Sequence, residues 1–124
     1  ADAYTAAMND ITIYHNARCS NSRGALEILR ERGSGPVIVD YIKAPLDAAR
    51  LTALVARLGV PVRELMRSKE ALYQELGLAA PERSDAELIA AIAEHPVLLN
   101  RPIVVTPKGA RLCRPPELVL DLIA

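Results

Sequence analysis

The chain has 124 residues, of which 51% are hydrophobic, so it is long enough to bury the core of one compact domain. Lys plus Arg and Asp plus Glu both number 15, and this neutral balance excludes a general electrostatic attraction to nucleic acid or to anionic membranes. Any affinity for anions must therefore come from a local cluster of cationic side chains.

The first forty residues have the pattern strand, helix, strand. The β-branched run Ile11–Tyr14 predicts a buried strand, and a polar loop follows it over residues 15–22. A helix is expected to begin at Asn21 or Ser22 and to end at Gly33, and residues 37–41 predict a second strand. The connection is long enough for the two strands to pair in parallel.

The middle of the chain is helix-rich. Asp47 leads a helix that Gly59 ends, and residues 62–68 predict a short helix followed by an irregular stretch to Ala80. A further helix is expected to begin with the capping-box pattern Ser84–Glu87 and to end before Pro96.

The C-terminal part predicts a hairpin and a last helix. Residues 103–106 form a predicted strand, residues 107–109 a turn, and residues 110–114 the partner strand. The final helix is expected to start at Pro115 or Pro116. This order predicts an α/β fold with a sheet of mixed direction, compatible with a thioredoxin-like layout.

The cysteine content indicates a reducing, cytoplasmic setting. Cys19 and Cys113 are the only cysteines, whereas a secreted disulfide scaffold would have more. No hydrophobic run approaches the length of a membrane span, and no secretory leader is visible. Met8 is a plausible natural start, so we expect one domain over residues 8–124, with residues 1–7 as an added or disordered tail.

The polar loop combines the residue types of an anion-binding nucleophilic site. It joins the end of a strand to the start of a helix, where free N–H groups and the helix dipole favour anions. The same field, with Arg18, Arg23 and His15 nearby, would favour the thiolate of Cys19. The competing interpretation is that Cys19 is an inert buried thiol and that His15 only ends the strand.

Two related kinds of site are disfavoured by spacing. A phosphatase-type loop needs an arginine six residues after its nucleophilic cysteine, but residue 25 is Ala and Arg23 comes too early. The histidines and cysteines at positions 15, 19, 95 and 113 lack the paired spacing of zinc ligands. With no glycine-rich nucleotide motif either, we expect no metal and no bound cofactor.

Candidate oxyanion ligands stand at the ends of predicted elements: Arg67, Arg101 and Arg114. Arginine suits tetrahedral oxyanions because its planar fork offers paired donors. The competing interpretation of each is a solvated surface residue, and spacing alone does not show that they converge on Cys19.

Two blocks of the sequence carry a family resemblance. The first is the run from Ile11 to Asn16, followed by Cys19 and Ser22-Arg23. The second is the run from Asn100 to Gly109, followed by Arg111-Leu112-Cys113-Arg114-Pro115. Together they resemble the glutaredoxin-dependent arsenate reductases of the ArsC type, and the resemblance extends from about Ile11 to the C-terminus.

The resemblance implies a fold and a set of site residues. The fold would be a thioredoxin-like mixed four-stranded sheet flanked by helices, with a helical insertion over roughly residues 47–95 and a cis peptide before Pro102. Cys19 corresponds to the family's nucleophile, and His15 and Ser22 to the residues that hold its thiolate. The positions that match the oxyanion-binding residues are Arg67, Arg101 and Arg114.

The resemblance also implies a reaction. The Cys19 thiolate would attack arsenic(V) of arsenate and expel water or hydroxide. Glutathione, as co-substrate, would then reduce the arsenic and displace it from Cys19, leaving a mixed species on Cys19. Glutaredoxin would resolve that species, and arsenite leaves. Cys113 does not attack in this scheme and is expected to be a packed core thiol.

The loop departs from the family at Ala17-Arg18, where many relatives have proline and a small residue, and at Ser20, where glycine is common. A related thiol-disulfide oxidoreductase acting on glutathione mixed disulfides is therefore kept as an alternative. It would need Cys19 but would tolerate loss of one or two arginines.

A redox-sensing regulator that contacts RNA polymerase is disfavoured, because Ser22 stands where a CxxC pair needs its second cysteine.

Overall fold

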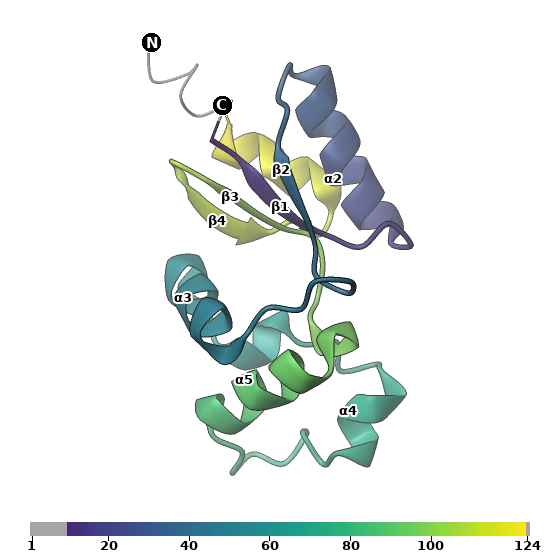
Figure 1. Ribbon diagram of the computed structural model, residues 1–124, viewed down its shortest axis with the longest axis vertical. Coiled ribbons are helices and arrows are strands. Elements are labelled where there is room, and N and C mark those ends of the chain that lie inside the picture. The colour runs from purple at the N-terminus through teal and green to yellow at the C-terminus, as the bar shows by residue number, and fades with distance from the viewer. Residues whose placement is uncertain (1–9, 124) are drawn as a thin grey trace. The chain divides into compact units, whose positions relative to one another are not determined.

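The computed structural model describes residues 10–123, which divide into two compact units (Figure 1). Of the described residues, the first unit contains 10–44 and 101–123, and the second is Pro45–Asn100. The tail predicted over residues 1–7 lies outside the described residues, and the single domain over residues 8–124 stays a prediction. None of the helices within residues 10–123 is both long and apolar enough to cross a membrane.

A mixed four-stranded sheet forms the centre of the first unit. Its strands are β1 (Thr12–His15), β2 (Val37–Asp40), β3 (Ile103–Thr106) and β4 (Gly109–Leu112), in the order β2-β1-β3-β4. The β1 strand pairs in parallel with β2 and antiparallel with β3, and β3 and β4 form an antiparallel hairpin. The predicted α/β class and the mixed sheet are confirmed.

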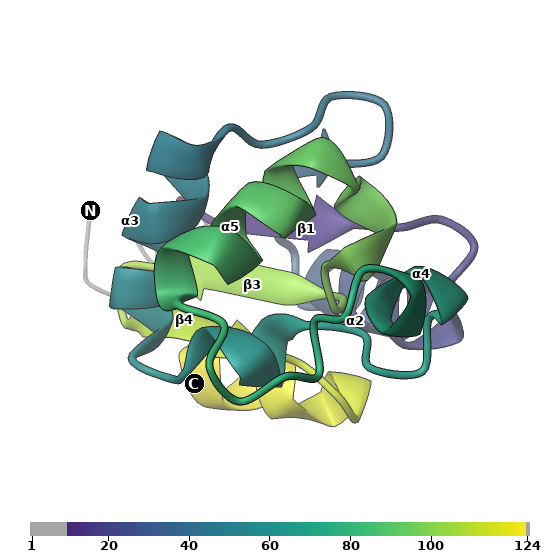
Figure 2. The same cartoon turned by 90° about the horizontal axis from the view of Figure 1, so that it is seen from below.

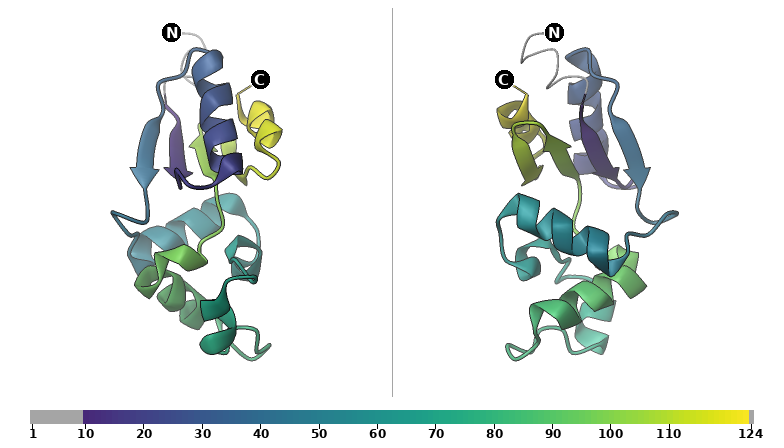
Figure 3. Two further views of the ribbon diagram at one scale, coloured as in Figure 1. Left: turned by 90° about the vertical axis from the view of Figure 1, so that its right-hand side faces the viewer. Right: turned by 60° about the vertical axis from the view of Figure 1, so that its left-hand side comes forward.

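Two helical segments pack on one face of this sheet (Figure 3). They are α2 (Ser20–Glu31) and the 3₁₀ helix η3 (Pro116–Leu122). Ala25, Leu26 and Leu29 of α2 lie on one stripe and pack with Ile13 of β1 and Val119 of η3 in the core. Ser22 belongs to the same stripe and is fully buried, so the helix period itself turns this hydroxyl inward.

The second unit is helical, as the predicted insertion requires. It contains α3 (Ala48–Leu58), η1 (Val62–Leu65), α4 (Ala71–Glu75), α5 (Asp85–Glu94) and η2 (Pro96–Leu98), with α3 and α5 packed together (Figure 2). The Asp47 side chain accepts a hydrogen bond from the backbone N–H of Arg50, and Gly59 ends α3 in the left-handed conformation with φ of 67°. The capping box of Ser84 and Glu87 starts α5 as predicted.

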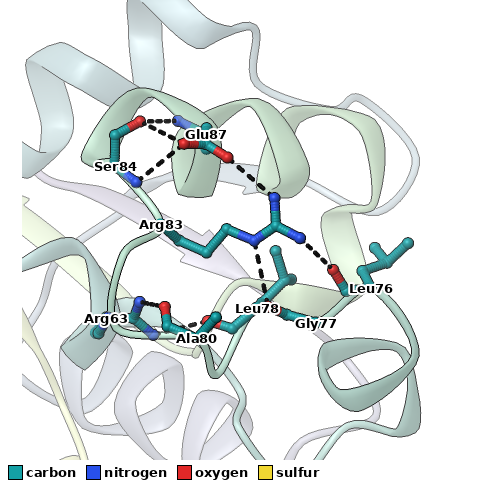
Figure 4. A network of polar contacts seen from close by, with 8 residues as sticks. All are labelled: Arg63, Leu76, Gly77, Leu78, Ala80, Arg83, Ser84 and Glu87. Carbon is teal, nitrogen blue, oxygen red and sulfur yellow. Dashed lines mark hydrogen bonds and ion pairs between the residues drawn. The ribbon is translucent and has the colours of Figure 1, made fainter.

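The stretch expected to be irregular up to Ala80 contains α4, so that expectation was wrong in part. Hydrogen bonds from two arginine side chains hold the residues that follow α4, and they leave no helix or strand pattern in the sequence. Arg63 donates hydrogen bonds to the carbonyl oxygens of Leu78 and Ala80 at 2.7 and 2.6 Å (Figure 4). Arg83 donates to those of Leu76 and Gly77, both at 3.2 Å.

The remaining differences are in strand bounds, which shift by one or two residues, and in helix type and helix starts. The final helix was expected from Pro115 or Pro116, and η3 occupies that place as a 3₁₀ helix, the form that suits short segments. The helix predicted over residues 62–68 is the shorter 3₁₀ helix η1. The α2 helix starts at Ser20, one residue before the earlier of its two expected starts.

Candidate active site

A tight turn presents Cys19 at the start of α2. The backbone N–H of Cys19 donates to the carbonyl oxygen of Asn16 at 3.0 Å, and the Asn16 side-chain oxygen accepts from the backbone N–H of Arg18 at 3.0 Å. Cys19 is the N-cap residue of α2, with extended backbone angles, and its carbonyl oxygen accepts from Arg23 at 3.0 Å. The thiol therefore lies where the free N–H groups of the first helical turn converge.

The surroundings of Cys19 favour its thiolate. Burial of the side chain, which is 7% exposed, opposes ionisation. The backbone N–H of Ser22, the charge of Arg101, the backbone N–H of Asn21 and a hydrogen bond from Arg114 outweigh that burial, so the pKa of Cys19 lies below its ordinary value. A larger share of the protein is thus thiolate at neutral pH than for a free cysteine.

Arg101 and Arg114 are brought to the thiol by the β3–β4 hairpin. Arg101 precedes β3 and Arg114 follows β4, and the pairing of Ile103 with Leu112 places the two segments side by side. The Arg114 Nη1 atom lies 3.7 Å from the Cys19 sulfur and donates to the carbonyl oxygen of Arg101 at 3.0 Å. Arg114 is largely exposed, so its remaining donors can receive an anion.

Each of these arginines precedes a cis proline. The peptide bonds Arg101-Pro102 and Arg114-Pro115 are both cis, so the cis bond expected before Pro102 is confirmed. A backbone hydrogen bond from Cys113 to the carbonyl oxygen of Pro102, 2.9 Å long, joins the two segments. The second cis bond had no counterpart among the sequence-based expectations.

His15 and Ser22 form a buried pair beside the thiol. The His15 Nδ1 and Ser22 Oγ atoms are 2.6 Å apart, and Ser22 Oγ also accepts from the backbone N–H of Asn16 at 3.0 Å. Burial lowers the pKa of His15, against the charge of Asp40 and with help from Arg30 and Arg23, so the imidazole is neutral at neutral pH. Ser22 therefore faces Cys19 with its backbone N–H and faces His15 with its hydroxyl.

Two further residues shape this loop in ways that spacing did not indicate. Asn16 closes the turn with both its backbone carbonyl and its side chain. Arg23, which was expected to help the thiolate directly, donates from Nη1 to the carbonyl oxygen of Ala17 at 2.8 Å and acts on the pKa of His15 instead. An asparagine followed three residues later by the helix N-cap is the signal that would have predicted the turn.

Arg67, the remaining predicted oxyanion ligand, belongs to the second unit. Its backbone N–H donates to the carbonyl oxygen of Leu98 at 2.8 Å, and Asn100 donates to that of Leu65 at 2.7 Å, around a bridge between Met66 and Leu99. Its guanidinium forms an ion pair with Glu70. Its part in binding an oxyanion stays a prediction.

Cys113 is a core thiol, as expected. It is fully buried among the apolar residues of the first unit, and its sulfur lies 3.6 Å from the carbonyl oxygen of Arg111. Burial raises the pKa of Cys113 to about 12, so this thiol stays neutral, whereas the pKa of Cys19 is lowered. Within residues 10–123, no group of three or more His, Cys, Asp or Glu side chains is arranged to hold a metal ion.

Ser22→Ala should loosen the loop. The substitution leaves the buried His15 Nδ1 and the partly buried N–H of Asn16 without their shared partner, so we expect a loss of about 1–3 kcal/mol in the free energy of unfolding, measured in urea. Ser20→Ala is the matched control, because Ser20 is exposed in the same helical turn. Equal stability of the two variants would contradict a structural role for the Ser22 hydroxyl.

Comparison with known proteins gives close matches over nearly the whole chain. The sequence model of the ArsC family matches residues 14–122. The arsenate reductase of Rhizobium meliloti is 50% identical over 113 residues, covering 91% of this chain and 81% of the relative. The Escherichia coli protein called uncharacterized protein YfgD is 49% identical over 114 residues, covering 91% of this chain and 96% of that protein.

A solved structure matches the fold as well. The structure described as an arsenate reductase from Vibrio cholerae superposes with a TM-score of 0.89 at 45% sequence identity, covering 94% of this chain and 98% of that chain. The resemblance seen in the sequence blocks around Cys19 and Arg101 therefore extends to the arrangement of the elements.

Proposed function

Because this chain belongs to the ArsC family, we propose that it reduces arsenate to arsenite through nucleophilic attack by the Cys19 thiolate. The observation that carries the proposal is the position of Cys19 at a helix N-terminus with Arg114 Nη1 at 3.7 Å from its sulfur. Arginine near the thiolate stabilises the anionic nucleophile and the charged oxygens of the substrate at once.

The first step forms a bond between sulfur and arsenic. The Cys19 thiolate donates its electron pair to arsenic(V), and one arsenate oxygen leaves as water or hydroxide. Arg101 and Arg114 would hold the remaining oxygens, and Arg67 is proposed as the third oxyanion ligand on the strength of the family resemblance. Neutral His15 acts on this step only through Ser22 and the shape of the loop.

The second step needs a further thiol, and we propose glutathione as the co-substrate. Cys19 and glutathione each lose one electron and join as a mixed disulfide, while arsenic gains two electrons and leaves as arsenite. A cavity of about 470 Å³ beside the loop is lined by both signs of charge, including Arg23, Glu27 and Arg30. Such a lining suits a zwitterionic peptide with carboxylates and an ammonium group.

Regeneration of Cys19 requires attack on that mixed disulfide, which we assign to glutaredoxin. Cys113 is fully buried and its thiol is neutral, so it is unsuited to resolve the disulfide within the chain. An external thiol must therefore return Cys19 to its reduced form, and glutaredoxin is the protein that we propose for this step.

A coupled assay tests this proposal. Oxidation of NADPH by glutathione reductase should depend on arsenate, on glutathione and on glutaredoxin, so that omission of any one of them stops turnover. The glutathione dependence itself is read from arsenite measured directly with reduced glutaredoxin present, because glutathione reductase oxidises NADPH only when glutathione is there. Arsenite that forms at an unchanged rate without glutathione would overturn the assignment of the second thiol.

The alternative function is a thiol-disulfide oxidoreductase acting on glutathione mixed disulfides. It is kept because the loop beside the thiol departs from the family at Ala17-Arg18 and at Ser20. An assay with glutathione and glutathione reductase but without glutaredoxin tests the disulfide activity of this chain, with a glutathione mixed disulfide in place of arsenate and Cys19→Ser as the control. Rapid turnover of the disulfide and none of arsenate would favour the alternative.

A further inference from the structure

The guanidinium of Arg67 has a carboxylate partner in its own unit. The Arg67 Nη1 atom lies 3.1 Å from Glu70 Oε2, and the two side chains are 28% and 31% exposed. Solvent screens such a half-buried pair less than a fully exposed one, so the interaction between the two charges is retained.

The backbone holds both residues of this pair in place. The N–H of Arg67 donates to the carbonyl oxygen of Leu98 at 2.8 Å, and the N–H of Glu70 donates to the carbonyl oxygen of Arg67 at 3.0 Å. Glu70 is also the N-cap residue of α4, yet its carboxylate accepts no capping hydrogen bond from that helix. The carboxylate is thus directed to Arg67 and not to the helix N-terminus, where it could have capped α4.

We propose that Glu70 is a positioning residue that competes with the oxyanion for the Arg67 guanidinium and so limits the affinity of the protein for oxyanions. The inference rests on the proposed function, in which Arg67 is an oxyanion ligand. An arriving dianion shares the arginine with a carboxylate of the same sign or displaces it. Both routes weaken anion binding relative to a guanidinium without such a partner.

The competition has a kinetic signature that a purely structural role would not produce. The repulsion from Glu70 acts on the bound substrate and on the transition state alike, because both carry the oxyanion charge. Removing the Glu70 charge should therefore lower KM for arsenate and leave kcat unchanged. The change should also shrink as ionic strength rises, because salt screens both the repulsion and the attraction.

Glu70→Gln removes the charge and keeps the size of the side chain. Its matched control is Glu75→Gln, because Glu75 ends the same helix, is exposed, and carries the same charge. Titration calorimetry with inorganic phosphate, an oxyanion that the protein cannot reduce, measures affinity without turnover. We expect Glu70→Gln to bind phosphate about three- to fivefold more tightly than wild type, with KM for arsenate lowered by the same factor.

A double-mutant cycle with Arg67→Ala separates this competition from other effects of the substitution. In the Arg67→Ala background, Glu70→Gln should change phosphate affinity no more than Glu75→Gln does. The inference is overturned if Glu70→Gln binds phosphate no more tightly than Glu75→Gln, or if the gain persists without Arg67. Those results leave arsenate turnover by the wild-type protein intact, whereas failure of the proposed function appears as absent arsenate turnover with phosphate binding still measurable.

Discussion

Cys19→Ser should reduce arsenate turnover by ~10³-fold or more, because a serine hydroxyl stays protonated where the cysteine is a thiolate. The helix N-terminus, Arg101 and Arg114 lower the pKa of the thiol, but they cannot bring the far less acidic hydroxyl into the range of neutral pH. The measurement is arsenate-dependent NADPH oxidation in the coupled assay with glutathione, glutathione reductase and glutaredoxin.

Cys113→Ala is the control for this prediction. Cys113 is fully buried with a raised pKa, so its loss should cost stability through a small core cavity and leave turnover within about threefold of wild type. Circular dichroism of both variants shows whether each is folded. Retained turnover in folded Cys19→Ser, or lost turnover in folded Cys113→Ala, would show that Cys19 is not the thiol that carries the chemistry.

Arg114→Ala should lower kcat/KM for arsenate by about 10²–10³-fold, the usual cost of removing one donor that stabilises developing negative charge. The same substitution removes the hydrogen bond to Cys19, so the pKa of the thiol should rise and the pH profile of kcat/KM should move to higher pH. Arg114→Lys should recover only part of the loss, because lysine keeps the charge but not the fork of paired donors.

Arg111→Ala is the matched control for Arg114. Arg111 lies on the same hairpin, and its exposed side chain forms an ion pair with Asp121 at 2.6 Å. The variant loses the same charge but has no contact with Cys19, so kcat/KM should change by less than about threefold. Similar losses in both variants would indicate a general effect of net charge and would contradict a specific role for Arg114.

The elements that could be predicted are those with local signals. Asp47 and Gly59 mark the two ends of α3 because capping and the left-handed conformation are properties of single residues. The position of Cys19 between β1 and α2 followed equally from a strand pattern, a polar loop and a helix pattern. In contrast, the residues that follow α4 are held by hydrogen bonds from the side chains of Arg63 and Arg83, and no helix or turn pattern in the sequence encodes those contacts.

The place of the candidate nucleophile at a helix start was predictable, and its surroundings were predictable only in part. The predicted helix start was enough to make Cys19 a candidate thiolate before the tertiary fold was known. The approach of Arg114 to Cys19 depends on the pairing of β1 with β3 and of β3 with β4, which brings residues far apart in sequence to one place. The family resemblance identified Arg114 as a candidate ligand near Cys19, which residue spacing alone could not do. Closeness in sequence was misleading for Arg23. It suggested a direct contact with the Cys19 thiolate, but the Arg23 side chain donates to the carbonyl oxygen of Ala17.

The pH dependence of Cys19 alkylation tests most directly whether this thiol is held as the attacking thiolate. The rate of reaction with iodoacetamide follows the thiolate fraction, so it rises with pH and levels off above the pKa. In Cys113→Ala, where Cys19 is the only cysteine, the midpoint should lie at lower pH than in the same chain unfolded in urea, and arsenate should slow the reaction of the folded protein. A midpoint at or above that of the unfolded chain, or alkylation that arsenate leaves unchanged, would contradict a reactive thiolate at an oxyanion site.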